Sequence, residues 1–348
     1  MKAIILHLYP QFGVGGTSAV AAEIGRALKQ RGITVHFATY AEPDYELFRS
    51  VTGLAPDKLL RERGRGLAAA SYPWVGGIFG SVHTLSYDLV VNAIYDHLSG
   101  YADLGYIHCL GRRTHKAGQP RSPLKRGLLT LDALFYCKAK TMAANSGWTA
   151  TQVEEACGVR PEVLYPPVKM CDRKLDVERE DLVVGLGRIS EDKNWEDFVE
   201  IARKLREKRN TRFVIMGALY EESYLEKLRR QARGCVEFMT DVSEDQKWSI
   251  LAKSRVVLHT KHAEHFGISV VEAMSCGAVP VVYSDGGVWS DILEKGRYGY
   301  GYQNTDEAVE AINQALDNHR EMEKEVQMKA QQYADEKFRE RILKLLDI

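Results

Sequence analysis

Short apolar runs alternate with longer amphipathic segments along this chain of 348 residues, and this alternation constrains the fold more than any other feature. The apolar runs at residues 3–8 and 33–39 have the length of strands, whereas residues 17–30 between them show helical spacing. Strands that alternate with helices form parallel sheets whose faces are covered by helices. We therefore predict an α/β protein built from doubly wound sheets, while residues 56–87 show no clear pattern.

The same pattern continues through the rest of the chain. Further strands are expected at residues 89–93, 105–109, 142–145, 162–165, 182–186, 213–216, 236–239, 256–259 and 279–283. Further helices are expected at residues 195–208, 222–233, 244–253 and 268–275. Residues 306–348 are rich in helix formers and show no strand pattern, so we expect the chain to end in helices.

The alternation breaks once, at Pro166 and Pro167, which precede a polar run at residues 169–181. Proline cannot continue a central strand, and a Pro-Pro pair stiffens the chain, so we expect a hinge between two domains. The predicted parts are an amino-terminal domain, a hinge, a carboxy-terminal domain and a final helix that packs back on the first domain, at residues 1–165, 166–181, 182–330 and 331–348.

Composition excludes several classes of protein. The 47 basic and 47 acidic residues balance, which argues against a general nucleic-acid binder. No run of 18 apolar residues predicts a transmembrane helix, and the start of the chain does not resemble a signal peptide. The six cysteines form no C-x-x-C pair, so we expect reduced thiols and a cytoplasmic location.

A glycine-rich turn, GVGGTS at residues 13–18, joins the first expected strand to the first helix. Glycines there let the backbone approach a ligand, and a helix amino terminus favours an anion. The spacing is not G-x-G-x-x-G, because Ser18 stands at the third glycine position, and this disfavours a dehydrogenase. The structural alternative is a tight turn in which Thr17 or Ser18 caps the helix.

A second glycine turn follows the first strand of the carboxy-terminal half, at residues 185–194. Arg188 and Lys193 in this loop can surround a diphosphate, since arginine makes bidentate contacts and lysine supplies a point charge. The alternative is a solvated loop in which these two cations pair with Glu191 and Asp192.

The segment at residues 262–274 carries two glutamates eight positions apart, Glu264 in a loop and Glu272 on an apolar helix. A carboxylate buried among apolar residues is unfavourable unless it accepts hydrogen bonds. Ribose hydroxyls would satisfy Glu272, and sugar hydroxyls would satisfy Glu264. The alternative for Glu272 is an internal salt bridge.

A zinc site is the rival interpretation of the same region. His259, His262 and His265 recur every three residues, and Cys276 follows. No known zinc-ligand spacing is matched, and the chain contains no D-x-D motif, so we expect no metal.

Two basic segments lie in the amino-terminal half. Residues 112–126 hold six Lys or Arg and no acidic residue, and Arg61, Arg63 and Arg65 precede an apolar stretch at residues 67–79. Basic residues beside aromatic ones can hold a protein on an anionic membrane surface, so a peripheral location is one expectation. The alternative is a solvated acceptor loop.

Taken together, these motifs resemble glycosyltransferase family 4, the retaining GT-B glycosyltransferases, over nearly the whole chain. The segments that carry the resemblance are GVGGTS, NSGWTATQV at 145–153, VLYPPV at 163–168, GLGRISEDKN at 185–194, EHFGISVVE at 264–272 and SDGGVWSDIL at 284–293. LHTKHAEHFGISVVEAM and YIHCLGRR look most like the α-mannosyltransferases of lipid-linked oligosaccharide assembly. The family fold has two facing Rossmann-like domains and a carboxy-terminal helix that crosses back.

The resemblance implies roles for matching residues. Arg188 and Lys193 match the pair that binds the donor diphosphate, Glu272 matches the residue that holds the ribose, and Glu264 matches a contact of the transferred sugar. His108 stands where the family often places a histidine near the reacting sugar. The matching backbone contacts of the donor are at Gly15, Gly16, Phe266, Gly267 and Ile268.

The resemblance implies a retaining hexosyltransferase that moves a hexose, mannose from GDP-mannose, onto a saccharide or lipid-linked acceptor. It requires no cofactor or metal, and no nucleic acid is expected as a partner. Two alternatives stay open: a transferase that uses a UDP-sugar, and a nucleotide-sugar-binding module without activity. The presence of Arg188, Lys193 and Glu272 disfavours the inactive module.

Overall fold

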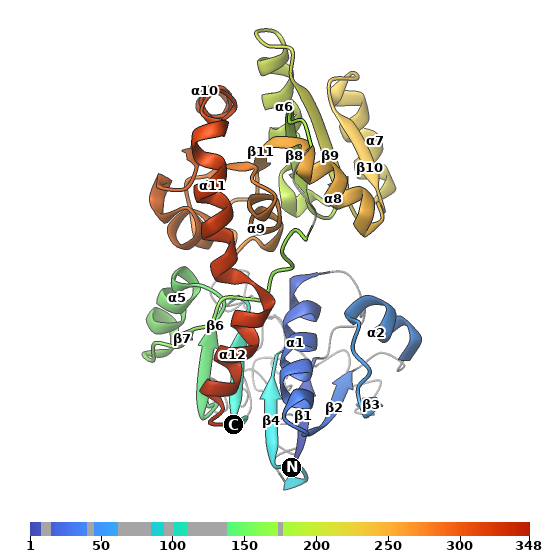
Figure 1. Ribbon diagram of the computed structural model, residues 1–348, viewed down its shortest axis with the longest axis vertical. Helices are drawn as coiled ribbons and strands as arrows, with labels where there is room; N and C mark the ends of the chain where they lie inside the picture. The colour runs from blue at the N-terminus through green and yellow to red at the C-terminus, as the bar shows by residue number, and fades with distance from the viewer. Residues whose placement is uncertain (8–14, 40–44, 62–84, 94–100, 110–137, 173–176) are drawn as a thin grey trace, which may run out of the picture. The chain divides into compact units, whose positions relative to one another are not determined.

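A computed structural model of the chain describes residues 1–7, 15–39, 45–61, 85–93, 101–109, 138–172 and 177–348. The chain divides into two compact units (Figure 1). Unit 1 comprises Met1–Pro167 together with Asp335–Ile348, and unit 2 comprises Val168–Ala334. Most of the segment expected as a hinge, residues 166–181, thus belongs to unit 2.

Unit 1 contains a seven-stranded parallel sheet in the order β3-β2-β1-β4-β5-β6-β7. The strands are β1 (Lys2–Leu6), β2 (Thr34–Thr39), β3 (Lys58–Arg61), β4 (Leu89–Asn92), β5 (Leu104–Ile107), β6 (Thr141–Ala144) and β7 (Glu162–Val163). Its described helices are α1 (Gly16–Gln30), α2 (Tyr45–Thr52), α5 (Gly147–Cys157) and α12 (Asp335–Leu345). The order turns outward on both sides of β1, as in doubly wound sheets.

The last helix of the chain, α12, lies beside the first helix, α1 (Figure 1). Phe338 and Ile342 of α12 are buried in the same apolar cluster as Ile24 of α1. At the edge of this contact, Arg339 Nη1 lies 2.5 Å from Glu23 Oε2. The chain therefore completes unit 1 with a helix that follows the whole of unit 2.

Unit 2 contains a six-stranded parallel sheet in the order β10-β9-β8-β11-β12-β13. The strands are β8 (Glu180–Leu186), β9 (Arg212–Gly217), β10 (Glu237–Thr240), β11 (Ser254–His259), β12 (Val279–Tyr283) and β13 (Tyr300–Tyr302). The α-helices are α6 (Trp195–Arg206), α7 (Glu222–Ala232), α8 (Glu244–Lys253), α9 (Ile268–Ser275), α10 (Thr305–Asp317) and α11 (His319–Ala330).

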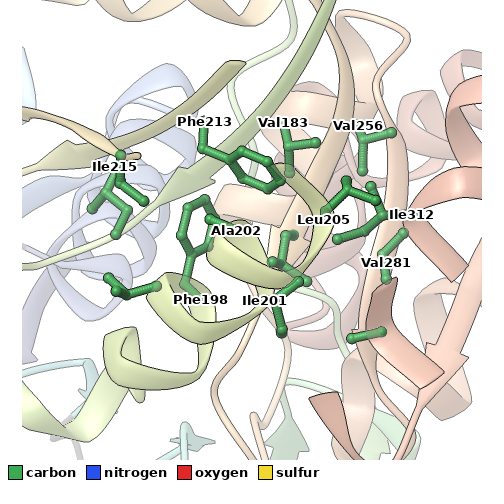
Figure 2. Packing of buried hydrophobic residues seen from close by; sticks show 14 of the residues in the cluster. Val183, Phe198, Ile201, Ala202, Leu205, Phe213, Ile215, Val256, Val281 and Ile312 are labelled. Carbon is green, nitrogen blue, oxygen red and sulfur yellow. The ribbon is translucent and has the colours of Figure 1, made fainter. Parts of the chain in front are cut away.

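Helix α6 packs one apolar face on the sheet of unit 2 (Figure 2). Phe198, Ile201, Ala202 and Leu205 recur with helical spacing and are fully buried. Phe198 meets Phe213 of β9 edge to face, with ring centroids 5.9 Å apart. Each large apolar side chain buried in this way contributes about 2 kcal/mol. This packing anchors the loop that leads from β8 into α6.

The sequence correctly predicted a parallel sheet in each half and most of the elements in them. Among the α-helices and strands, four were not predicted: the helices α2 and α5 and the strands β3 and β13. Strand β3 falls within residues 56–87, where the sequence shows no clear pattern, and β13 has three residues, too few for an alternation. No helix among the residues that the structure describes is both long and apolar enough to cross a membrane.

The cysteines differ from the expectation in one place. Cys109, Cys171, Cys235 and Cys276 are not disulfide-bonded, but Cys157 is. The prediction that every cysteine is reduced is therefore wrong at Cys157. Sequence spacing could not exclude this bond, because a disulfide requires proximity in space and not along the chain.

Candidate functional site

Three loops of unit 2 follow the carboxyl ends of neighbouring parallel strands. Residues 187–194 follow β8, residues 260–267 follow β11, and residues 284–287 follow β12. Because β8, β11 and β12 are adjacent and parallel, these loops meet at one edge of the sheet. Ligands of open α/β sheets bind at this edge.

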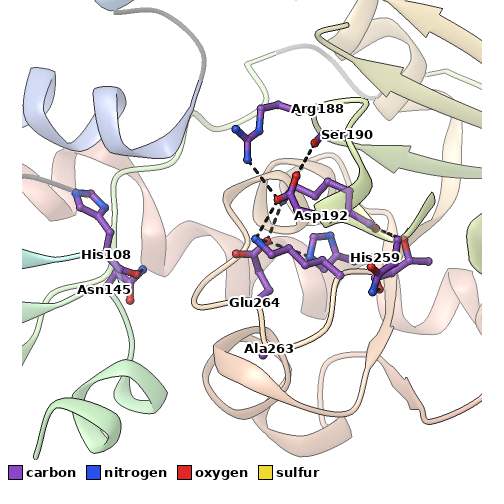
Figure 3. A network of polar contacts seen from close by, with 12 residues as sticks. His108, Asn145, Arg188, Ser190, Asp192, His259, Ala263 and Glu264 are labelled. Atoms are coloured by element: carbon purple, nitrogen blue, oxygen red, sulfur yellow. Dashed lines mark hydrogen bonds and ion pairs between the residues drawn. The ribbon is translucent and has the colours of Figure 1, made fainter. Parts of the chain in front are cut away.

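The first loop presents Arg188 next to Asp192 (Figure 3). Arg188 Nη2 donates to Asp192 Oδ2 over 3.3 Å, and Ser190 Oγ donates to Asp192 Oδ1 over 2.5 Å. The guanidinium of Arg188 also lies 5.4 Å from the centre of the Tyr220 ring. Burial alone would raise the pKa of Asp192, but the Ser190 hydrogen bond and nearby cations lower it. Arg188 is therefore paired with Asp192, one of the two acidic partners that the solvated-loop alternative predicted.

The second loop presents Glu264, and three basic side chains lie close to one of its carboxylate oxygens. Glu264 Oε2 lies 3.0 Å from Lys193 Nζ, 3.5 Å from His259 Nε2 and 3.6 Å from Lys261 Nζ. Burial would raise the pKa of Glu264, but Lys193, His259 and Lys261 outweigh it and hold that pKa well below its usual value. Burial lowers the pKa of His259, so its imidazole is neutral at pH 7. Glu264 is therefore an ionised carboxylate, and its partner Lys193 comes from the other loop.

The third loop holds the backbone around Glu264. Gly287 N donates to Glu264 O over 2.8 Å, and Ala263 N donates to Asp285 Oδ1 over 2.7 Å. Gly286 has φ 73°, and a Cβ atom there would lie 2.5 Å from Glu264 O. Only glycine allows this close approach, so the glycine pair of the SDGG segment positions the carboxylate.

Helix α9 begins directly after the second loop, at Ile268. Gly267 precedes its first residue with φ 87°, and Gly267 O accepts a hydrogen bond from Val270 N over 3.0 Å. Phe266 is buried and meets the Tyr333 ring edge to face at 5.3 Å. The backbone from Phe266 to Ile268 thus lies at a helix amino terminus, where N–H groups favour an anion.

Glu272, on α9, forms an internal salt bridge that the sequence left as an alternative. Its Oε1 lies 3.0 Å from Lys247 Nζ of α8, and both side chains are largely buried. Burial raises the pKa of Glu272, and Lys247 partly offsets this. Lys247 also lies 2.9 Å from Glu244 Oε1. A carboxylate accepts up to about four hydrogen bonds, so this pair leaves capacity for hydroxyl groups.

Lys247 and Lys261 are two residues of this region that sequence analysis did not select. Lys247 lies in none of the motifs identified above, and Lys261, although it lies within the LHTKHAEHFGISVVEAM segment, is one of many lysines in the chain. Their importance follows from the carboxylates that tertiary packing places next to them.

The histidines of the zinc interpretation do not share a centre. His259 faces Glu264, whereas the His262 ring stacks on Tyr283 with centroids 3.7 Å apart. Within the described parts of the chain, no group of three or more His, Cys, Asp or Glu side chains is arranged to hold a metal.

Three predicted residues, Gly15, Gly16 and His108, belong to unit 1. His108 directly follows β5, is buried, and its carbonyl accepts a hydrogen bond from Asn145 Nδ2 over 2.8 Å. Gly15 and Gly16 lie at the start of α1. The other predicted site residues are all in unit 2.

The start of α1 does not use the predicted side-chain cap. Gly15 is its N-cap residue, and no side chain caps the helix there. Ser18 Oγ instead lies 3.2 Å from Nε2 of the buried His7. His7 directly follows β1, so this contact with a strand end competes with local capping by Ser18. Gly13, Val14 and both basic segments (61–79 in large part, and 112–126) lie outside the residues whose side chains are described.

Family comparisons cover nearly the whole chain. Residues 14–170 match the model described as Glycosyltransferase Family 4, and residues 172–336 match the model described as Glycosyl transferases group 1. The chain belongs to glycosyltransferase family 4. In this glycosyltransferase, Glu264, Glu272 and the Arg188–Lys193 pair all lie within residues 172–336, the region that matches the group 1 model.

Curated relatives of this glycosyltransferase carry one shared name. The protein of Dictyostelium discoideum named GDP-Man:Man(3)GlcNAc(2)-PP-Dol alpha-1,2-mannosyltransferase is 26% identical over 237 residues, which cover 60% of this chain and 47% of that protein. The Xenopus laevis protein of the same name is 25% identical over 306 residues, covering 77% and 60%. The chain thus spans about half to three fifths of the length of these relatives.

Solved structures share the fold of this glycosyltransferase at low identity. Anabaena Alr3699/HepE, crystallised with UDP and glucose, has a TM-score of 0.74 and 18% identity, with 100% of this chain and 99% of that chain covered. WaaG, a glycosyltransferase involved in lipopolysaccharide biosynthesis, has a TM-score of 0.70 and 16% identity, with 99% of each chain covered. Together with the two parallel sheets, these likenesses confirm the predicted GT-B fold.

Proposed function

We propose that this glycosyltransferase moves mannose from GDP-mannose onto a saccharide or lipid-linked acceptor, with retention of anomeric configuration. One observation carries the proposal: Arg188, Lys193 and the ionised Glu264 converge at the carboxyl ends of β8 and β11. The name of the curated relatives supports the choice of mannose and of GDP.

Arg188 and Lys193 act on the donor diphosphate. In the described structure their partners are Asp192 and Glu264, which lie 3.3 Å and 3.0 Å away. A diphosphate exchanges one or both of these carboxylate contacts for contacts to phosphate oxygens. Negative charge grows on the leaving diphosphate as the glycosidic bond breaks, and prepositioned cations stabilise it in the transition state.

Glu264 and Glu272 bind hydroxyl groups of the donor. Glu264 is ionised, so it acts as an acceptor for hydroxyls of the transferred sugar. Glu272 accepts ribose hydroxyls while Lys247 holds it. Phe266, Gly267 and Ile268 supply backbone groups beside the sugar.

The reaction follows a front-face route. The acceptor oxygen bonds to the anomeric carbon on the face that the diphosphate leaves, so configuration is retained. The bond from that carbon to the phosphate oxygen breaks, and the leaving phosphate takes the acceptor proton. This route needs no metal and no separate protein base.

A UDP-sugar is the second candidate donor, because HepE was crystallised with UDP and glucose and shares the fold. A thermal-shift screen of GDP, UDP, ADP and their sugar conjugates tests both, since a ligand of the folded state raises the melting temperature. The best donor is then used for transfer to a lipid-linked saccharide, and the product's anomeric configuration is read by nuclear magnetic resonance. Stabilisation by GDP-mannose with transfer of mannose supports the proposal. Binding without transfer to any acceptor favours an inactive module.

We also propose that the protein works at the cytoplasmic face of a membrane. A lipid-linked acceptor is presented at a membrane surface, and the basic segment at residues 112–126 would attract anionic lipid.

A further inference from the structure

Lys261 brings a third positive charge to the cluster formed by Arg188 and Lys193. It follows β11 by two residues, and its side chain is 21% exposed. Its Nζ lies 3.5 Å from Asp192 Oδ2 and 3.6 Å from Glu264 Oε2. The lysine therefore stands between the two carboxylates of the site.

Each of these carboxylate oxygens already has a better-placed cation. Asp192 Oδ2 accepts from Arg188 over 3.3 Å, and Glu264 Oε2 lies 3.0 Å from Lys193. Both distances to Lys261 exceed the range of about 2.7–3.2 Å for good N–H···O hydrogen bonds. Lys261 adds attraction to two oxygens without saturating the donor capacity of its ammonium group, so a closer anion would be the better partner.

The residue before Lys261 is hydrogen-bonded to the loop at residues 187–194, which carries Arg188 and Lys193. The preceding residue, Thr260, donates from Oγ1 to Lys193 O over 2.8 Å. Thr260 O accepts a hydrogen bond from Asn194 Nδ2 over 3.3 Å. These two bonds fix the start of the loop that carries Lys261 relative to Lys193. The backbone therefore holds the two lysines near one another.

The charges around this point favour an added anion. Arg188, Lys193 and Lys261 are positive, and they face two ionised carboxylates, Asp192 and Glu264. The neighbouring His259 is neutral at pH 7, because burial lowers its pKa. Among these five side chains one positive charge is left over, and Lys261 supplies it. Without Lys261, Arg188 and Lys193 would be balanced by Asp192 and Glu264 alone.

We propose that Lys261 binds the donor diphosphate as a third cation beside Arg188 and Lys193. This inference rests on the proposed function, because it needs a diphosphate at the edge formed by β8 and β11. The rival role is internal neutralisation of Asp192 and Glu264. That role predicts a loss of stability on substitution, with no selective effect on phosphate-bearing ligands.

The test compares GDP with guanosine by isothermal titration of the full chain, and UDP with uridine in parallel. Lys261→Met should weaken binding of the diphosphate about tenfold, which equals about 1.4 kcal/mol, and leave binding of the nucleoside unchanged. Lys261→Arg keeps the charge and should restore affinity to within about threefold of wild type. The matched control is Lys253→Met, because Lys253 directly precedes β11, at the opposite end of that strand. This control should bind like wild type.

The outcomes separate this inference from the function on which it rests. If Arg188→Ala weakens diphosphate binding and Lys261→Met does not, the inference is wrong and the diphosphate site stands. If neither variant changes binding, or wild type binds neither diphosphate, the proposed function fails as well. An equal loss for nucleoside and diphosphate in Lys261→Met would also overturn the inference, because it signals a structural role. Lys261→Gln replaces the Met variant if that variant fails to fold.

Discussion

Replacing Arg188 and Lys193 by alanine should reduce turnover similarly but affect stability very differently. The reason lies in their surroundings. Lys193 and Glu264 are 3.0 Å apart with side chains 15% and 14% exposed, so alanine leaves a buried carboxylate without its nearest cation. Arg188 pairs with Asp192 at 3.3 Å, and this pair is more exposed, at 30% and 45%.

These environments set the expected loss of stability. Breaking a buried pair usually costs about 3–5 kcal/mol, but Lys261 stays 3.6 Å from Glu264, so we expect about 2 kcal/mol for Lys193→Ala. A loss of this size lowers the melting temperature by roughly 4–8 °C in a domain of this size. The exposed Arg188 pair is worth about 0.5 kcal/mol, so Arg188→Ala should melt within about 2 °C of wild type.

The effect on catalysis should be similar for both variants. Removing one preorganised group that meets developing charge raises the barrier by about 3 kcal/mol, or about a hundredfold in rate. Each variant should lose more in turnover than in donor affinity, because the charge on the leaving diphosphate grows toward the transition state. The double variant should lose less than the product of the two single losses, since both groups serve one diphosphate.

The assay is the rate of transfer at saturating donor, measured below the melting temperature of each variant. Glu226→Ala and Arg230→Ala, which alter an exposed pair on α7, provide controls for nonspecific effects. If both single variants keep wild-type turnover and only their Michaelis constants rise, the residues bind the donor but do not stabilise its transition state. If Arg188→Ala destabilises as much as Lys193→Ala, the reasoning from burial is wrong.

Three further predictions concern the ribose contact, pH and the membrane. Glu272→Ala should weaken nucleotide-sugar binding at least tenfold in isothermal titration, whereas Glu244→Ala, which removes the exposed partner of the same lysine, should not. Burial lowers the pKa of His7 to about 4, so near pH 5 the unfolded chain binds a proton that the folded chain does not. The free energy of unfolding should therefore be unaffected by His7 above about pH 6.5 and should fall by up to about 3 kcal/mol as the pH falls to about 4. The variant His7→Gln should flatten this part of the pH profile of stability, measured by urea unfolding. Serine at the five Arg and Lys positions 112, 113, 116, 125 and 126 should release the protein from anionic vesicles and leave activity on a soluble acceptor intact.

Each of these predictions has an outcome that contradicts it. A folded Glu272→Ala variant with wild-type affinity removes the ribose role. An unchanged pH profile for His7→Gln means that the histidine does not stay neutral when folded. Wild-type protein that never sediments with anionic vesicles at low salt removes the membrane hypothesis.

The fold could be predicted from sequence because its signals are local. Apolar runs such as β12 and the helical spacing of α6 report which faces become buried, wherever their partners lie along the chain. The loop motifs could be found in the same way, since residues 185–194 and 264–272 carry their chemistry within a few positions. The elements missed were α2, α5, β3 and β13; β3 lies in a stretch with no clear pattern, and β13 has only three residues.

Sequence by itself determined the α/β class, the break after the Pro-Pro pair and the identity of the charged loop residues. Tertiary structure decided which charges meet: Lys193 with Glu264, and Lys247 with Glu272, although 71 and 25 positions separate them. The physical reason is that a parallel sheet gathers the carboxyl ends of β8, β11 and β12 at one edge, whatever their distance along the chain. Burial at that edge then decides protonation, so that Glu264 stays charged while His259 stays neutral.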